Sequence, residues 1–166
     1  MNDRAPAPGG LALIQSLVNT LDLGSGADSL DTAEGLARFG LAQGEAEAAR
    51  ELRESLRVVC LAHAGHPAHR TVVPLGELLA RAPLHITVDE RDGGAGFALA
   101  GSAPLASRVA VAIAESLVDG TWPRLKACEA PDCHGAYYDR SPAGRGRWCS
   151  MSVCGARAKM RRYRAK

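Results

Sequence analysis

Apolar residues recur at helical spacing in five stretches of the first 120 residues. In the first stretch Leu13, Leu17 and Leu21 repeat at i, i+4 and i+8, the period at which side chains share one helix face. In the longest stretch acidic residues crowd the start and arginines follow. The last stretch is apolar on most faces and is expected to be buried. The patterns predict helices over residues 11–23, 31–39 with Asp31 as N-cap, 45–64, 71–81 and 105–118.

A glycine-rich reversal separates the fourth and fifth predicted helices. Residues 84–88 and 97–100 flank the sequence DGGAG at positions 92–96. Glycine supplies the positive φ that a tight reversal needs, so this segment predicts a β-hairpin. Residues 1–10 are rich in Pro and Gly and predict a disordered leader. The fold class expected is α+β and mostly helical, with a helical domain over residues 11–120 that contains one β-hairpin.

The charge is distributed unevenly along a chain of ordinary globular composition. The 166 residues are 46% apolar and 23% charged, which suits a chain with a substantial core. Residues 1–120 hold 9 basic and 15 acidic side chains, a net charge of −6, whereas residues 121–166 hold 11 and 3, a net charge of +8. This asymmetry predicts two modules and a polyanionic partner for the basic one. Without an apolar run of about 20 residues or a signal-peptide pattern, no membrane contact and a cytoplasmic location are expected.

Four of the five cysteines lie near the C-terminus in two equally spaced pairs. Cys128 and Cys133, then Cys149 and Cys154, each have C-x4-C spacing, and 15 residues separate the pairs. Each close pair can occupy one tight turn, so the two pairs supply the four tetrahedral ligands that zinc prefers. Four protein thiolates leave no open position, which is typical of structural zinc. The sequence predicts one structural Zn2+ ion, whose binding would contribute on the order of 10 kcal/mol to folding this small segment.

Other interpretations of the cysteines fit the sequence less well. Two disulfides would suit a secreted domain, but the chain shows no secretion pattern and cytosolic thiols stay reduced. The spacing neither favours nor excludes redox-switched release of zinc. His134 adjoins Cys133 and is interpreted as a bystander, because the paired spacing favours the cysteines. Cys60 lies on the apolar face of a predicted helix and is interpreted as a core residue.

A basic helix is predicted to begin at the last cysteine. Ala156, Met160 and Tyr163 share one stripe and are expected to pack on the zinc module. Like charges crowd the neighbouring stripe, and they repel one another unless a polyanion meets them. A solvated basic tail that aids solubility is the simpler alternative. The candidate nucleic-acid-binding residues are Arg145, Arg147, Arg157, Lys159, Arg161, Arg162 and Arg164.

Beyond its cysteines, the segment 121–166 resembles the CGNR zinc finger family. Positions 139–141 read D-R-S, positions 147–151 read R-W-C-S-M and positions 154–159 read C-G-A-R-A-K, close to the family pattern that ends in C-G-N-R-x-K. The segment 11–120 is similar to the ABATE domain through the sequence VNTLD at 18–22 and its order of helices and hairpin. The resemblance implies a zinc finger of two cysteine knuckles and a terminal helix, in a bacterial stress-induced transcription regulator that binds DNA.

Two departures from the family pattern affect these expectations. Ala156 stands where the family has Asn, so a side chain that could cap a turn or contact a partner is missing. Gly135 and Ala136 stand where bulky apolar residues often follow the second cysteine, which predicts a looser core for the finger. Neither departure touches a cysteine, so the zinc prediction is unchanged.

The acidic segment carries no catalytic pattern, and no enzyme is expected. His63, His66 and His69 are interrupted by Gly65 and Pro67 and are interpreted as a loop. The DGGAG sequence lacks the Lys and the strand–helix order of a phosphate loop. From the two-module layout we hypothesise that residues 11–120 form a sensory or dimerising domain. An unknown small-molecule or protein effector and a homodimer are the corresponding partners.

The leading functional hypothesis is a cytoplasmic DNA-binding transcription regulator. The main alternative is a zinc-stabilised protein-interaction module, in which the acidic domain docks against a basic finger of its own chain or of a partner. An RNA-binding accessory protein is a third hypothesis.

Overall fold

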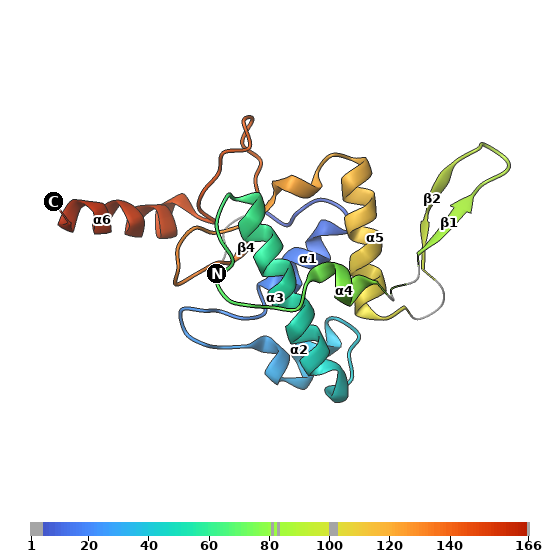
Figure 1. Cartoon of the computed structure of the whole chain (residues 1–166), viewed down its shortest axis with the longest axis horizontal. Coiled ribbons are helices and arrows are strands. Elements are labelled where there is room, and N and C mark those ends of the chain that lie inside the picture. The colour runs from blue at the N-terminus through green and yellow to red at the C-terminus, as the bar shows by residue number, and fades with distance from the viewer. Residues whose placement is uncertain (1–4, 81, 83, 100–102, 166) are drawn as a thin grey trace.

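The fold is mostly helical, with two small antiparallel hairpins, as the computed structural model shows for residues 5–80, 82, 84–99 and 103–165 (Figure 1). The expectations for residues 1–4, Arg81, Pro83, Ala100 and Lys166 lie outside these described residues. In chain order the helices are α1 (Leu11–Val18), α2 (Ala33–Ala37), α3 (Ala46–His63), α4 (Leu75–Leu79), α5 (Leu105–Val118) and α6 (Ala156–Arg164). The strands are β1 (His85–Val88), β2 (Ala95–Ala98), β3 (Leu125–Ala127) and β4 (Ala136–Tyr138), paired β1 with β2 and β3 with β4.

The two long predicted helices are confirmed as α3 and α5, whereas the other three are shorter than predicted, with α2 covering only Ala33–Ala37 of the predicted 31–39. The prediction that the first helix continues to Leu23 is wrong, because the chain turns after Val18 and Leu21 forms a β-bridge with Asp28. The helix predicted over 71–81 keeps only the five residues of α4, which begin after Pro74. The cap of α2 is Thr32 rather than Asp31, since the Thr32 hydroxyl accepts a hydrogen bond from the Gly35 N–H at 3.0 Å.

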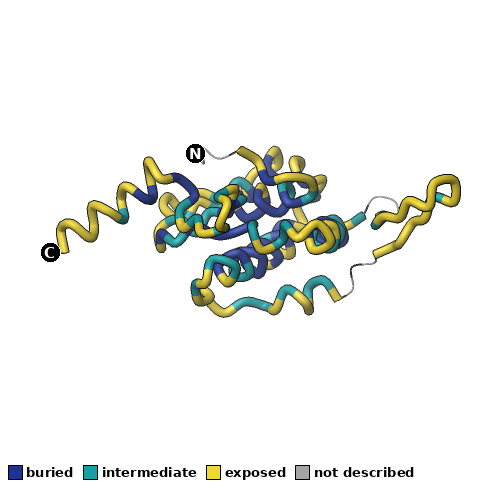
Figure 2. The backbone as a smooth tube through the Cα atoms, turned by 90° about the horizontal axis from the view of Figure 1, so that it is seen from above, coloured by how far each residue is buried: buried dark blue, intermediate teal, exposed yellow. Residues whose placement is uncertain are grey.

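The hydrophobic core lies where α1, α3 and α5 meet. Leu17, Leu56 and Val109 are each fully buried there, and Figure 2 shows the buried backbone gathered in the middle of the body. The same cluster continues into the C-terminal segment, because Leu125 of β3 and Ala136 of β4 are also fully buried in it. The β3–β4 hairpin of the basic segment is therefore built into the core of the helical domain. No pattern in the sequence predicted this hairpin.

A buried ion network holds these two parts together. The Arg57 side chain is fully buried, and its Nε donates to the Glu54 carboxylate at 3.1 Å. Its two Nη atoms donate to the backbone carbonyls of Val18 in α1, at 2.8 Å, and of His134 beside the cysteines, at 2.9 Å. Burial would raise the pKa of Glu54, but the charges and hydrogen bonds of Arg57 and Arg53 outweigh it and hold that pKa below its ordinary value. One guanidinium thus joins α1, α3 and the C-terminal segment.

Two side chains complete this junction. Asn19 pairs with the edge of β4, since its Nδ2 donates to the Ala136 carbonyl at 2.9 Å and its Oδ1 accepts from the Ala136 N–H at 2.7 Å. His63, which was interpreted as part of a loop, is instead the last residue of α3. Its Nδ1–H donates to the Leu125 carbonyl of β3 at 2.8 Å. Both side chains satisfy backbone groups of the small hairpin that would otherwise be unpaired on burial.

The extremities of the molecule are exposed. The β1–β2 hairpin and α6 project from opposite ends of the body in both views (Figures 1 and 2). The expectation that α5 is buried on most faces is wrong at its end, where Leu117 and Val118 are exposed. Residues 5–10 of the expected leader lie against the body, with Ala7 buried and its N–H donating to Gln15 Oε1 at 2.6 Å. Among the described residues, no helix has the length and apolar character needed to cross a bilayer.

Replacing Arg57 tests the buried network. An Arg57→Met variant removes one of the two guanidinium partners of the buried Glu54 carboxylate and leaves two backbone carbonyls unsatisfied. We expect the free energy of unfolding to fall by about 3–5 kcal/mol, measured by urea denaturation of the zinc-loaded protein. Arg38→Met, at an exposed position of the same domain, is the matched control and should change stability by less than about 0.5 kcal/mol. A loss below about 1 kcal/mol for Arg57→Met would contradict the role assigned to this side chain.

Candidate metal centre and basic surface

The first cysteine pair sits on a tight turn that follows β3. After Cys128 the chain reverses, and the N–H groups of Cys133 and His134 both donate to the Ala130 carbonyl. His134 adopts a left-handed conformation with φ of 41°, and its Nδ1–H donates to the Cys128 carbonyl at 3.0 Å. This bond orients the His134 ring as a brace within the turn, which agrees with its interpretation as a bystander.

The second pair is presented by a different local structure. Cys149 precedes a wide π-helical turn, η4 (Met151–Gly155), and Cys154 lies inside that turn. Ser150 caps the turn, because its hydroxyl accepts from the Val153 N–H at 3.3 Å. Gly155 allows a close approach here, since a Cβ at this position would lie 3.1 Å from Met151 Sδ and 3.3 Å from Trp148 Cδ1.

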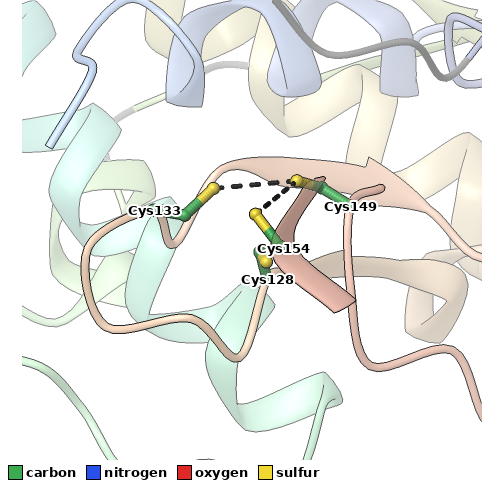
Figure 3. A group of neighbouring side chains, drawn as sticks. All are labelled: Cys128, Cys133, Cys149 and Cys154. Carbon is green, nitrogen blue, oxygen red and sulfur yellow. Dashed lines mark hydrogen bonds between the residues drawn. The ribbon is translucent and has the colours of Figure 1, made fainter. Parts of the chain in front are cut away.

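The four sulfur atoms converge on one centre (Figure 3). All four Sγ atoms lie within 4.8 Å of one another, and the Cys133–Cys149 and Cys149–Cys154 Sγ distances are both 3.7 Å. A tetrahedral zinc site with Zn–S bonds of about 2.3 Å requires sulfur–sulfur distances of about 3.8 Å. All five cysteines are free thiols rather than disulfides. The residues therefore fit one structural zinc ion, and among the described residues no second cluster of metal-binding side chains is found.

The fifth cysteine and the neighbouring histidines have other surroundings. Cys60 is fully buried in the apolar core, and burial raises the pKa of its thiol to about 12. Within the metal cluster, hydrogen bonds from the neighbouring thiols of Cys128 and Cys149 lower the pKa of Cys133. Thiolate, the form that binds metal, is thereby favoured at Cys133, whereas hydrogen bonds with neighbouring thiols raise the pKa values of Cys128 and Cys149, and burial disfavours thiolate at Cys60.

A buried carboxylate organises the loop between the two pairs. Asp139 is 1% exposed and accepts hydrogen bonds from the Ser141 hydroxyl at 2.7 Å, the Gly146 N–H at 2.7 Å and the Lys126 ammonium at 3.0 Å. Burial alone would raise the pKa of Asp139, but these hydrogen bonds hold it well below its ordinary range. The D-R-S sequence singled out earlier thus shapes the loop that carries Arg145 and Arg147.

Two of the seven predicted nucleic-acid-binding residues are paired with acidic residues of the first cysteine turn. Arg147 forms a two-pronged ion pair with Glu129, and its guanidinium lies 5.3 Å from the centre of the Trp148 ring. Arg157 lies 3.1 Å from the Asp132 carboxylate and donates to Cys154 Sγ at 3.3 Å. These pairings give both arginines a local structural role that sequence analysis did not foresee.

The other five predicted residues are Arg145, Lys159, Arg161, Arg162 and Arg164. All five are exposed, and none forms an ion pair within the part of the chain that the structure describes. Four of them lie on α6, which is confirmed as a terminal helix. The structure gathers these four cations on one projecting helix, whereas Arg145 lies in the loop between the two cysteine pairs (Figure 1).

The apolar stripe of α6 does not pack as predicted. Met160 and Tyr163 are 52% and 78% exposed, so the expectation that this stripe covers the zinc module is wrong. The physical reason is the direction of α6, which leaves the body after the π-helical turn instead of folding back over it (Figure 1).

The small residues after Cys133 allow close packing, a role that the sequence did not indicate. They were expected to loosen the core of the finger, but Ala136 is fully buried and paired with Asn19. A Cβ at Gly135 would lie 3.2 Å from Asn19 Oδ1, tighter than an ordinary contact. Small side chains therefore let α1 approach β4. The sequence signal lay in VNTLD at 18–22, whose Asn19 was noted only as part of a resemblance.

Comparison with known families gives two matches, one to each of the two segments of the chain. A family described as "CGNR zinc finger" matches residues 124–166. The ABATE family, described as "Putative stress-induced transcription regulator", matches residues 11–120, which is more than half of the chain. A comparison with curated proteins finds no match.

The metal content provides a direct test of the site. Elemental analysis of the purified protein should give one zinc per chain, and a Cys149→Ser variant should hold substantially less, because one thiolate is removed from a closed tetrahedral site. Cys60→Ala is the matched control, since Cys60 lies in the core and outside the cluster, and it should keep one zinc. Full zinc content in Cys149→Ser would overturn the ligand set.

Acid titration tests the role of Asp139. The lowered pKa means that the carboxylate contributes stability fully above its unfolded value of about 3.9 and loses that contribution as the pH falls towards the folded value. We expect Asp139→Asn to lower the unfolding free energy by about 3 kcal/mol at pH 7. The difference between wild type and variant should stay constant from about pH 8 to 5 and narrow below about pH 4. Urea denaturation at several pH values measures it, and a difference that widens in acid would contradict the assignment.

Proposed function

The chain belongs to the ABATE family and ends in a CGNR zinc finger, and from that premise we propose that it regulates transcription by binding duplex DNA through α6. The observation that supports this most strongly is that the α6 cations are exposed and have no acidic partner on their helix. Lys159, Arg161, Arg162 and Arg164 are exposed on a helix that carries no acidic residue and projects from the body (Figure 1). Phosphates of a duplex supply the negative charge that such a helix lacks.

The zinc site supports the binding role by fixing where α6 begins. Cys154 binds the metal and lies directly before the helix, so the first turn of α6 is anchored at the zinc centre. With four thiolates around it, the metal has no position for a substrate or water. We therefore assign the metal a structural role and propose a regulator rather than an enzyme. The cytoplasm, where thiols stay reduced, suits such a site.

The alternative hypothesis was that the acidic domain docks against the basic charges of the finger. In the structure, docking of the finger and the basic charge of α6 involve different residues. The finger does dock on the helical domain of its own chain, but through β3, β4 and the buried Arg57 rather than through the cations of α6. The basic helix is left available to a partner outside the chain. This arrangement favours nucleic acid over the acidic domain as the partner of α6.

The remaining parts of the proposal concern the acidic domain. We propose that residues 11–120 connect a stress signal to DNA binding, and the support is the description of the family that this segment matches. The exposed β1–β2 hairpin lies far from α6 (Figures 1 and 2), so an effector or second subunit held there would leave the basic helix accessible.

Salt dependence tests DNA binding by α6. Each phosphate contact contributes about 0.9 to the slope of log K against log salt concentration. Replacing Arg161, Arg162 and Arg164 together with Gln should weaken binding to duplex DNA and reduce that slope by about 2.7. Fluorescence anisotropy between low and physiological salt measures both quantities.

A matched triple variant distinguishes a contact from a general charge effect. Arg38, Arg70 and Arg91 are exposed on the other module, and their replacement with Gln removes the same charge. This control should keep most of the affinity and the full salt slope. Equal losses in the two triple variants, or absence of duplex binding by the zinc-loaded wild type at low salt, would overturn the proposal.

A further inference from the structure

A groove lies in the angle between α6 and the two cysteine turns. Its volume is about 930 Å³. Pro131 and Trp148 form the wall on the finger side, and Met160 and Tyr163 form the wall on the helix side. The phosphate contacts proposed for α6 involve its cations and do not account for these aromatic and apolar side chains.

The side chains of the helix wall are unusually exposed for their type. Tyr163 is 78% and Met160 is 52% exposed, and both lie on the α6 stripe that leaves the body. Large apolar and aromatic side chains at such a position keep a substantial apolar area in contact with water. A ligand with a flat apolar face would cover that area.

The same groove is rich in positive charge. Lys159, Arg161 and Arg162 line it beside the aromatic walls. The one carboxylate in the lining, Glu129, is already paired with Arg147, and that pairing keeps the pKa of Glu129 low. The ligand that complements this groove must therefore carry repeated negative charges next to flat apolar faces.

We infer that the groove binds single-stranded nucleic acid, with an unstacked base covering Tyr163 and phosphates against the flanking cations. Aromatic side chains interleaved with cations are the usual platform for single strands, because every base has a face that can stack. In a duplex the base faces are hidden, so duplex DNA can satisfy the cations of α6 but not the aromatic walls. An acidic peptide offers the charge without a regular series of flat faces. This inference rests on the proposed contact between α6 and phosphates and adds to it a specific class of nucleic acid.

The test compares three probes on the zinc-loaded full chain. They are a ten-nucleotide thymidine oligonucleotide, an abasic oligonucleotide of the same length and charge, and a duplex. We expect the thymidine strand to bind at least about fivefold more tightly than the abasic strand, since stacking of one base is worth that much or more. Fluorescence anisotropy gives all three affinities under one salt condition.

Two variants assign the effect to the groove. Tyr163→Ala removes the stacking surface, keeps the charge and places a strong helix former in α6. We expect it to weaken binding of the thymidine strand at least about fivefold and to leave the abasic strand and the duplex unchanged. Val118→Ala is the matched control, because Val118 is also 78% exposed but lies on α5, and it should change none of the three affinities.

The outcomes separate this inference from the proposed function. Normal duplex binding together with equal affinities for the thymidine and abasic strands would overturn the inference alone. If none of the three probes binds, both the inference and the proposed function are overturned. Binding of a ten-residue polyglutamate peptide that is lost in Tyr163→Ala, with no preference for bases, would show a peptide groove and would also overturn the inference.

Discussion

A single buried guanidinium connects the main parts of this molecule. Arg57 lies fully inside the protein, where its charge is balanced by Glu54 and its remaining donors reach backbone carbonyls of α1 and of the first cysteine turn. An unpaired charge at this depth would be strongly unfavourable. The turn that carries Cys128 and Cys133 must therefore remain against α1 and α3 for the charge to stay satisfied. Together with Asn19, His63 and the buried side chains of β3 and β4, Arg57 sets the position of the cysteine turns relative to the helical domain.

The features that could be predicted from the sequence depend on residues that lie close together along the chain. The two C-x4-C pairs and the long amphipathic α3 depend on spacing within a few residues, and such spacing is visible in a sequence. The burial of β3 and β4 in the helical core and the pairing of Asn19 with β4 depend instead on contacts between distant segments, and the α6 stripe is exposed because it has no such contact. Asn19 illustrates the difference, since 117 positions separate it from Ala136, the residue that it pairs with. Such a contact leaves no local pattern in a single chain.

The same distinction applies to the basic surface. Counting charges placed Arg147 and Arg157 with the other cations, because composition does not show which acidic residue lies beside which arginine. In the folded chain Glu129 and Asp132 are brought next to them by the first cysteine turn. The three acidic residues of the segment 121–166 are thus all used inside the finger, with Asp139 paired to Lys126. What remains for a partner is the concentrated charge of α6.

The core shared by β3, β4 and the helices has a thermodynamic consequence. Because Leu125 and Ala136 are buried among residues of α1 and α3, the finger and the helical domain are expected to unfold as one cooperative unit. A ligand that binds only the folded state stabilises everything that unfolds with its site. Zinc bound by four C-terminal thiolates would then stabilise the acidic domain as well, and the amount of folded protein in a cell would follow the availability of the metal.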